Sequence, residues 1–211
     1  MALYKSALAA IGLLGITAQA AGVSGSAFGF ASGTTGGGSA SPAAPKDVSQ
    51  LTDWLSDSTP RVILIDKEFN YIGSSGKCSD CKCCIPSSNS CGSQGQNAID
   101  LESSDWCGDY PTTTCSYDKA GIEGINVGSN KSVVGVGSAG VIRGKGLRLQ
   151  GGASNVIIQN IHITELNPQY IWGGDAITLD GTDQVWIDHV TVSLVGRQMF
   201  VSGYKASRLM F

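Results

Sequence analysis

A short segment in the second half of the chain combines an aromatic ring, two glycines and a carboxylate in a pattern that suits ligand binding. Residues 172–179 read Trp-Gly-Gly-Asp-Ala-Ile-Thr-Leu. The two glycines allow the backbone to approach a ligand closely. Asp175 precedes an apolar alternation, so we expect it at the edge of a strand, where it either faces a ligand or caps a turn.

A second charged residue, Arg197, follows Asp175 by 22 residues. If the chain coils with that repeat, both side chains share one face on successive coils. Such a pair is either a salt bridge alone or a grip on a sugar acid, because the forked guanidinium suits carboxylate and hydroxyl oxygens. His189 lies between them at a bend, which we expect it to fix through backbone hydrogen bonds. The motifs of serine hydrolases, zinc proteases and phosphate loops do not occur.

The elements that position these residues repeat along the second half of the chain. Residues 131–135, 154–164 and 183–193 align with starts 23 and 29 residues apart. In the last two, a period-2 apolar alternation slips by one residue at the same place, which indicates two short strands joined by a bend. Units of this kind bury their apolar residues only by stacking, so the pattern predicts an all-β solenoid, a parallel β-helix. An antiparallel sandwich is the alternative, although only Asp180-Gly181 offers a hairpin signal.

The first half of the chain is less regular. Residues 22–46 are rich in Gly, Ser and Ala and predict an extended lead-in. Helical spacing of apolar residues over 46–56 predicts a short N-terminal helix, and the β-branched run over 61–66 predicts a buried strand. Residues 71–119 predict a cysteine-rich loop with little pattern. Residues 207–211 fit the strand pattern poorly.

Composition and targeting signals set the compartment and exclude several classes. Only 15% of the residues are charged, 29 are glycine, and the formal net charge is −3. These values exclude a helical bundle, a coiled coil and a basic nucleic-acid binder. Residues 1–20 have a positive start, an apolar centre and a small-residue cleavage site, which predicts a secretory signal peptide. We therefore expect a secreted, extracellular protein with one domain over 21–211 and no nucleic-acid or membrane partner.

Seven cysteines lie within 38 positions, which indicates disulfides in an oxidising compartment. Their spacing also allows a zinc cluster, but the chain has only two histidines. The odd count leaves one cysteine without a partner inside this chain. Asn130-Lys-Ser132 is an acceptor sequence for N-linked glycan in a secreted chain, so we expect Asn130 to be glycosylated. The seven are Cys78, Cys81, Cys83, Cys84, Cys91, Cys107 and Cys115.

Several motifs together resemble those of fungal pectin lyases, a branch of the pectate lyase superfamily. They include Asp105-Trp-Cys107, Asn155-Val-Ile-Ile-Gln-Asn-Ile161, Trp172-Gly-Gly-Asp-Ala-Ile-Thr-Leu179, Val185-Trp-Ile-Asp-His-Val190 and Gly196-Arg-Gln198. The resemblance runs over about residues 22–203. It implies a right-handed parallel β-helix. Gly-Arg-Gln, where pectate lyases tend to carry acidic calcium ligands, favours the pectin-lyase branch.

The resemblance also implies a reaction and a set of site residues. Pectin lyases cleave methyl-esterified polygalacturonan by β-elimination, without a metal or other cofactor, and a full-length monomer is expected. Asp175 and Arg197 match supporting residues of the active cleft. Trp172, Trp106 and Tyr110 match its aromatic wall. The resemblance pairs Cys107 with Cys83 or Cys84, leaves Cys91 without its partner, and does not pair Cys78, Cys81 and Cys115.

This chain also departs from the family pattern. Family members are longer, and the resemblance places their principal catalytic arginine beyond Phe211; Arg208 lacks the surrounding motif. We therefore expect a fragment, truncated after the first coils of the β-helix and inactive as it stands. A calcium-dependent pectate lyase and a non-catalytic pectin-binding β-helix are the alternatives.

Overall fold

The computed structural model describes residues 22–101, 104–203 and 205–211, and the predicted signal peptide lies outside them. The described chain is a parallel β-helix, as predicted, because every strand pair in its three main sheets is parallel. This pairing rules out the antiparallel sandwich. The right-handed sense of the coil stays a prediction.

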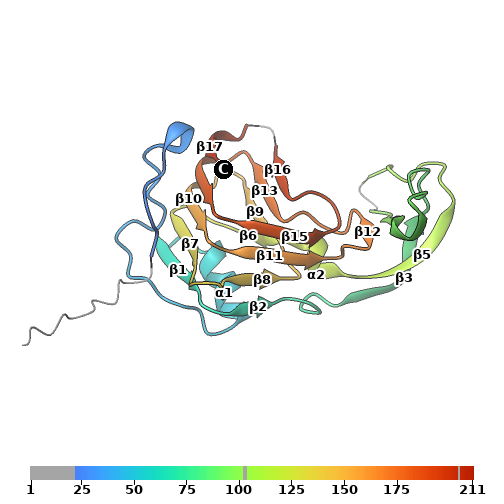
Figure 1. Ribbon diagram of the computed structural model, residues 1–211, viewed down its shortest axis with the longest axis horizontal. Helices are drawn as coiled ribbons and strands as arrows, with labels where there is room; N and C mark the ends of the chain where they lie inside the picture. The colour runs from blue at the N-terminus through green and yellow to red at the C-terminus, as the bar shows by residue number, and fades with distance from the viewer. Residues whose placement is uncertain (1–21, 102–103, 204) are drawn as a thin grey trace, which may run out of the picture.

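Each turn of the coil visits three sheets in the same order. The first sheet contains β1 (Arg61–Ile65), β7 (Lys131–Gly135), β10 (Ser154–Gln159), β14 (Asp183–Asp188) and β17 (Ser207–Met210). The second contains β2 (Glu68–Asn70), β8 (Val141–Arg143), β11 (His162–Leu166) and β15 (Thr191–Val195). The third contains β6 (Ile125–Asn126), β9 (Leu147–Gln150), β13 (Ile177–Asp180) and β16 (Phe200–Ser202). Figure 1 shows β2, β8, β11 and β15 as successive layers.

The register of the first sheet corrects one predicted alignment. Ser154 lies opposite Asp183, as the repeat predicted, but Lys131 pairs with Val156 rather than with Ser154. The prediction aligned the starts of the strands, whereas β10 begins two residues before its paired segment. Residues 207–211 fit the strand pattern poorly in the sequence, yet residues 207–210 form β17, which pairs with β14.

The bend between the first two sheets falls where the apolar alternation slips. Asn160 and His189 occupy this corner on successive coils, both in the left-handed backbone region at φ 54° and 52°. His189 does not fix the corner through backbone hydrogen bonds as expected. Its exposed ring lies 2.8 Å from the Asp188 carboxylate instead, and the local backbone conformation makes the bend.

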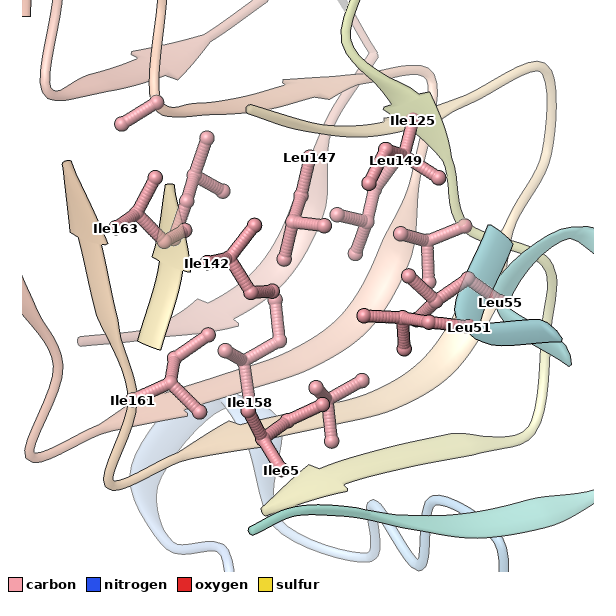
Figure 2. Packing of buried hydrophobic residues seen from close by; sticks show 14 of the residues in the cluster. Leu51, Leu55, Ile65, Ile125, Ile142, Leu147, Leu149, Ile158, Ile161 and Ile163 are labelled. Atoms are coloured by element: carbon pink, nitrogen blue, oxygen red, sulfur yellow. The ribbon is translucent and has the colours of Figure 1, made fainter. Parts of the chain in front are cut away.

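The core is one apolar column inside the coil (Figure 2). Ile158 and Ile161, on either side of the bend, both point into it, which explains the slip in the sequence pattern. The predicted helix is α1 (Val48–Ser56), capped by the Asp47 side chain, and it buries Leu51 and Leu55 in the same column. Among the described residues, no helix has the length and apolarity needed to cross a membrane.

The cysteine-rich region is an ordered arm rather than the predicted loop. Its strands β3 (Lys77–Cys84), β4 (Asn97–Ile99) and β5 (Thr112–Asp118) form a fourth, mostly antiparallel sheet, joined by β12 (Tyr170–Ile171) from the coil. The arm is inserted between β2 and β6 and projects sideways from the stacked coils (Figure 1). Hydrophobic periodicity missed it because β3 has no alternating apolar face. The strands of the arm are joined by the Cys83–Cys115 disulfide and by small clusters of buried residues. The short elements η2 (Gly92–Gln94) and α2 (Lys119–Glu123) complete it.

Three disulfides fasten the arm. Cys83 is bonded to Cys115, Cys84 to Cys107, and Cys78 to Cys81. The Cys84–Cys107 bond is one of the two pairings that the resemblance implied. Cys78, Cys81 and Cys115, which could not be paired from the sequence, all have partners. The zinc alternative is therefore set aside, because these sulfurs are bonded to one another. Cys91 is free and exposed.

The lead-in over 22–46 lies against the first sheet. It is largely irregular, with the short η1 (Gly29–Ala31), and Ala43 bridges to Ile63 of β1. Two polar side chains of β10 hold it: Gln159 exchanges hydrogen bonds with the backbone of Ser24, and Asn155 accepts from backbone nitrogens near residue 35. The lead-in therefore covers apolar surface of the sheet, including Trp186.

Candidate active site

Trp172 lies where the coil meets the cysteine arm. It follows β12 directly and adopts a left-handed backbone conformation at φ 65°, which is unfavourable for a bulky residue. Its ring packs against the two hydrophobic clusters that contain the Cys83–Cys115 and Cys84–Cys107 disulfides. This packing holds the strained conformation, and such strain is often found at functional sites.

The arm brings two further aromatic rings to Trp172. The ring centre of Trp106 lies 5.8 Å from that of Trp172, edge to face, and 5.8 Å from that of Tyr110. Trp106 directly precedes Cys107, so the Cys84–Cys107 disulfide fixes the backbone beside it. Trp106 is 37% exposed. The three aromatic residues named from the sequence therefore lie in one group, with Trp106 partly open to solvent.

Asp175 and Arg197 form the ion pair that the spacing predicted. Arg197 Nη1 donates to Asp175 Oδ2 at 2.8 Å, and the backbone nitrogen of Gln198 donates to Oδ1 at 3.0 Å. Asp175 lies just before β13 and Arg197 just before β16, and these strands are neighbours in the third sheet. The guanidinium carbon of Arg197 also lies 4.3 Å from the ring centre of Trp172. We call Trp106, Tyr110, Trp172, Asp175 and Arg197 the Trp172 cluster.

A glycine allows the Arg197 turn to approach Trp172. A Cβ atom on Gly196 would lie 2.5 Å from the carbonyl oxygens of Asn167 and Tyr170. That distance is far below van der Waals contact, so any other residue would push the two turns apart. The Gly-Arg-Gln motif therefore has a geometric reason: its first residue permits the contact that its second residue makes.

Arg148 is a residue near this cluster that the sequence did not single out. It lies on β9, and its guanidinium donates to the carbonyl oxygen of Asp175 at 2.9 Å. Burial lowers the pKa of Arg148, Asp175 opposes this effect, and the charge of Arg197 adds to it. No motif marks Arg148, because its role depends on a carbonyl 27 residues away in the sequence.

A cavity of about 880 Å³ lies elsewhere on the arm, beside Cys78, Cys81 and Lys82. None of the Trp172 cluster lines it. Its lining includes the Lys82–Asp100 ion pair and, among the described residues, a single aromatic ring, Tyr117. We therefore take the Trp172 cluster as the candidate site. Among the described residues, no group of three or more His, Cys, Asp or Glu side chains is arranged to hold a metal ion.

Asn130, the predicted glycosylation site, is half-buried. Its side-chain oxygen accepts from Asn155 Nδ2 at 2.8 Å, and its backbone has a φ of 59°. The hydroxyl of Ser132, the third acceptor position, is buried and accepts from the backbone nitrogen of Gly37. Recognition of this sequence by a glycosylating enzyme therefore requires the unfolded chain.

The fold and the site together define a parallel β-helix protein that carries a group of aromatic rings beside an arginine–aspartate ion pair. A model of the pectate lyase family matches residues 1–198. The chain belongs to the pectate lyase family.

Curated fungal relatives match nearly all of this chain. A protein named "Probable pectin lyase F" from Aspergillus niger is 72% identical over 208 residues, which is 98% of this chain and 44% of the relative. Its namesake from Aspergillus flavus is 68% identical over 98% of this chain and 48% of its own length. "Probable pectin lyase F-2" from Aspergillus terreus is 70% identical over 98% and 43%. This chain thus spans less than half the length of these curated relatives.

Solved structures also match. A thermostable pectate lyase has a TM-score of 0.48 and 20% identity, covering 78% of this chain and 47% of that one. A pectate lyase variant from Xanthomonas campestris has a TM-score of 0.41 and 21% identity, covering 78% and 40%.

Proposed function

We propose that the Trp172 cluster binds methyl-esterified polygalacturonan as part of a pectin lyase active site. The observation that carries this proposal is the position of Arg197, which is held between the Asp175 carboxylate and the face of Trp172. The pair neutralises its own charge, so the site offers rings and hydrogen-bond donors rather than free carboxylates. Fungal relatives named pectin lyase F support this assignment.

The reaction is a β-elimination. A base takes the C5 proton of a galacturonate ester, which is α to the ester carbonyl, and the electrons of the C5–H bond form the C4–C5 double bond. The C4–oxygen bond breaks, and the leaving oxygen takes up a proton. Esterification removes the charge of the carboxylate, so the developing carbanion needs less electrostatic stabilisation. Arg197 donates hydrogen bonds to the ester and the aromatic rings stack on sugar faces.

Arg197 acts in this scheme as a fixed donor rather than as the base. A guanidinium has N–H donors and no acceptor. Arg197 Nη1 donates to Asp175 Oδ2 at 2.8 Å, and the Asp175 side chain is only 15% exposed. Asp175 thereby orients the donor toward the substrate.

A binding titration tests this function. Highly esterified oligogalacturonides are added to the chain while tryptophan fluorescence is followed, and the same is done with de-esterified chains, with and without calcium. We expect saturable binding of the esterified form that needs no calcium and is weakened in Arg197→Lys. Arg208→Lys is the matched control, because Arg208 pairs with Asp183 on successive coils but lies over none of the aromatic rings that the structure describes. Binding only of de-esterified chains with calcium would support the pectate lyase alternative instead.

We further propose that the protein is secreted after removal of residues 1–20, that residues 21–211 form one domain, and that Asn130 carries glycan. The three disulfides support an oxidising compartment. The single apolar column, with residues from α1 to β17 packed in or against it, supports one domain.

A further inference from the structure

The turn that carries Trp172 and Asp175 is fastened to α2 from two sides. On one side, the Asn167 amide donates to the carbonyls of Asp118 and Gly173 at 2.9 and 2.8 Å. On the other side, Arg148 donates to the carbonyls of Ile122 and Asp175 at 3.3 and 2.9 Å. Asn167 therefore joins the N-terminal end of α2 to this turn, and Arg148 joins the C-terminal part of α2 to the same turn.

The Arg148 guanidinium donates its hydrogen bonds to backbone carbonyls. Its third contact is the carbonyl of Leu147 at 3.2 Å. The Ile122 carbonyl lies in the last turn of α2, where carbonyls lack a partner within the helix and a cation is favourable. A half-buried arginine costs desolvation, which three oriented carbonyls offset. A flat, forked group is needed to reach two segments at once, and lysine cannot do this.

The chain makes room for this arginine. A Cβ atom on Gly124 would lie 2.7 Å from the Cγ and Cζ atoms of Arg148. Gly124 ends α2 at φ 70°, a conformation that also favours glycine. The guanidinium is thus enclosed by α2 and its own strand on one side and by the Asp175 turn on the other.

We propose that Arg148 is a positioning residue for the candidate active site: by bonding the Asp175 carbonyl, it sets the orientation in which the Asp175 carboxylate receives Arg197. The ion pair in turn holds Arg197 over Trp172. This proposal rests on the proposed function for its effect on substrate. Its effect on Trp172 does not depend on that function.

Three variants of the 211-residue chain test the proposal. Arg148→Lys keeps the charge but loses the fork, and Arg148→Ala leaves a space that free guanidinium ion can enter. Arg143→Lys is the matched control, because Arg143 is also half-buried, on β8 of the second sheet, but is paired with the carboxylates of Glu68 and Glu165. Two quantities are measured: the near-ultraviolet circular dichroism of the tryptophans, and the affinity for esterified oligogalacturonides.

We expect Arg148→Lys to change the near-ultraviolet signal and to weaken binding about tenfold, while Arg143→Lys changes neither. Millimolar guanidinium is expected to restore binding to Arg148→Ala, which a general loss of stability would not allow. Unchanged affinity and signal in Arg148→Lys would overturn the proposal, as would equal effects in the Arg143→Lys control. If the parent chain binds no oligogalacturonide, the proposed function fails, and the near-ultraviolet signal alone then decides the role of Arg148. If Arg148→Ala does not fold, the near-ultraviolet signal and the affinity of Arg148→Lys test the proposal.

Discussion

The guanidinium of Arg197 lies over the ring of Trp172 at 4.3 Å and at the same time donates to Asp175 at 2.8 Å. The arginine comes from one coil, and the ring and carboxylate come from the coil before it. A cation on an aromatic face and a cation beside a carboxylate are each modest interactions near a surface. Together they fix the direction of the remaining N–H groups of Arg197.

Removal of the Asp175 carboxylate is expected to loosen this arrangement. In Asp175→Asn, Arg197 loses a charge-assisted hydrogen bond, and such bonds contribute roughly 1.5–3 kcal/mol. We expect the affinity for esterified oligogalacturonides to fall about tenfold, since 1.4 kcal/mol corresponds to a factor of about ten. Calorimetric titration measures the change. Asp183→Asn, in the other coil-to-coil Asp–Arg pair, is the control and is expected to bind as the parent chain does.

The 211-residue chain is expected to bind substrate without cleaving it. Arg197 donates to Asp175 and Arg148 donates to backbone carbonyls, so both arginines of this site serve as donors and neither is placed to accept the C5 proton. Ultraviolet absorbance of unsaturated product, with highly esterified pectin and no calcium, measures cleavage. Robust turnover that disappears in Arg197→Ala would show that the base is Arg197 itself.

The Cys84–Cys107 bond is expected to stabilise both the fold and the aromatic group. Removing a native disulfide typically costs about 2–4 kcal/mol. We expect Cys84→Ser with Cys107→Ser to lower the free energy of unfolding by this amount and to change the environment of Trp106. Denaturant unfolding followed by tryptophan fluorescence reports both. Cys91→Ser removes an exposed free thiol and serves as the control, with an expected change near zero. An equal loss in both variants would contradict this role.

A buried lysine makes the chain sensitive to the charge of Asp57. Lys131 is fully buried, and its ammonium donates to the Asp57 carboxylate at 2.9 Å. Burial alone would raise the pKa of Asp57, but hydrogen bonds from Arg61 and Lys131 lower it to about 2. Since the folded pKa lies below the ordinary value of 3.8, this carboxylate stabilises the fold above that pH and ceases to do so as the pH falls through about 2.

Asp57→Asn is therefore expected to destabilise the chain at neutral pH by roughly 1.5–3 kcal/mol, the range for a hydrogen bond to a charged group, because the Asp57 side chain is 30% exposed. Unfolding midpoints in urea, taken at steps between pH 5 and 2, measure the effect. Asp183, held by Arg208, also has a pKa lowered to about 2. The Asp57→Asn variant therefore keeps the part of the acid sensitivity that comes from Asp183. If the urea midpoints of the parent chain and of Asp57→Asn changed with pH in parallel, Asp57 would not contribute to the pH dependence of stability.

Asn130 is expected to carry glycan when the protein passes through a eukaryotic secretory pathway. Deglycosylation of the secreted protein should lower its mass, and Asn130→Gln should abolish that difference. Asn126→Gln is the control, because Asn126 is exposed in the nearby β6 but is not followed by the acceptor pattern. An unchanged mass after deglycosylation would show that the sequence is unused.

Local patterns in the sequence predicted much of the fold. The slip in apolar alternation predicted two strands per unit and a bend, because side chains on both sides of the corner must reach one column. The 22-residue separation of Asp175 and Arg197 predicted their contact, because it nearly equals the 23 residues between the paired Ile177 and Phe200 on neighbouring coils. In a stacked coil, one repeat length determines many contacts at once.

Contacts across the cysteine arm were decided by the tertiary structure. Seven cysteines allow many pairings, and the sequence left three of them unassigned, because only the antiparallel pairing of β3 with β5 brings Cys83 opposite residues near Cys115. Arg148 was not recognised for the same reason. Its partners are carbonyl oxygens, which every residue possesses, so only the packing of α2 against the Asp175 turn distinguishes it.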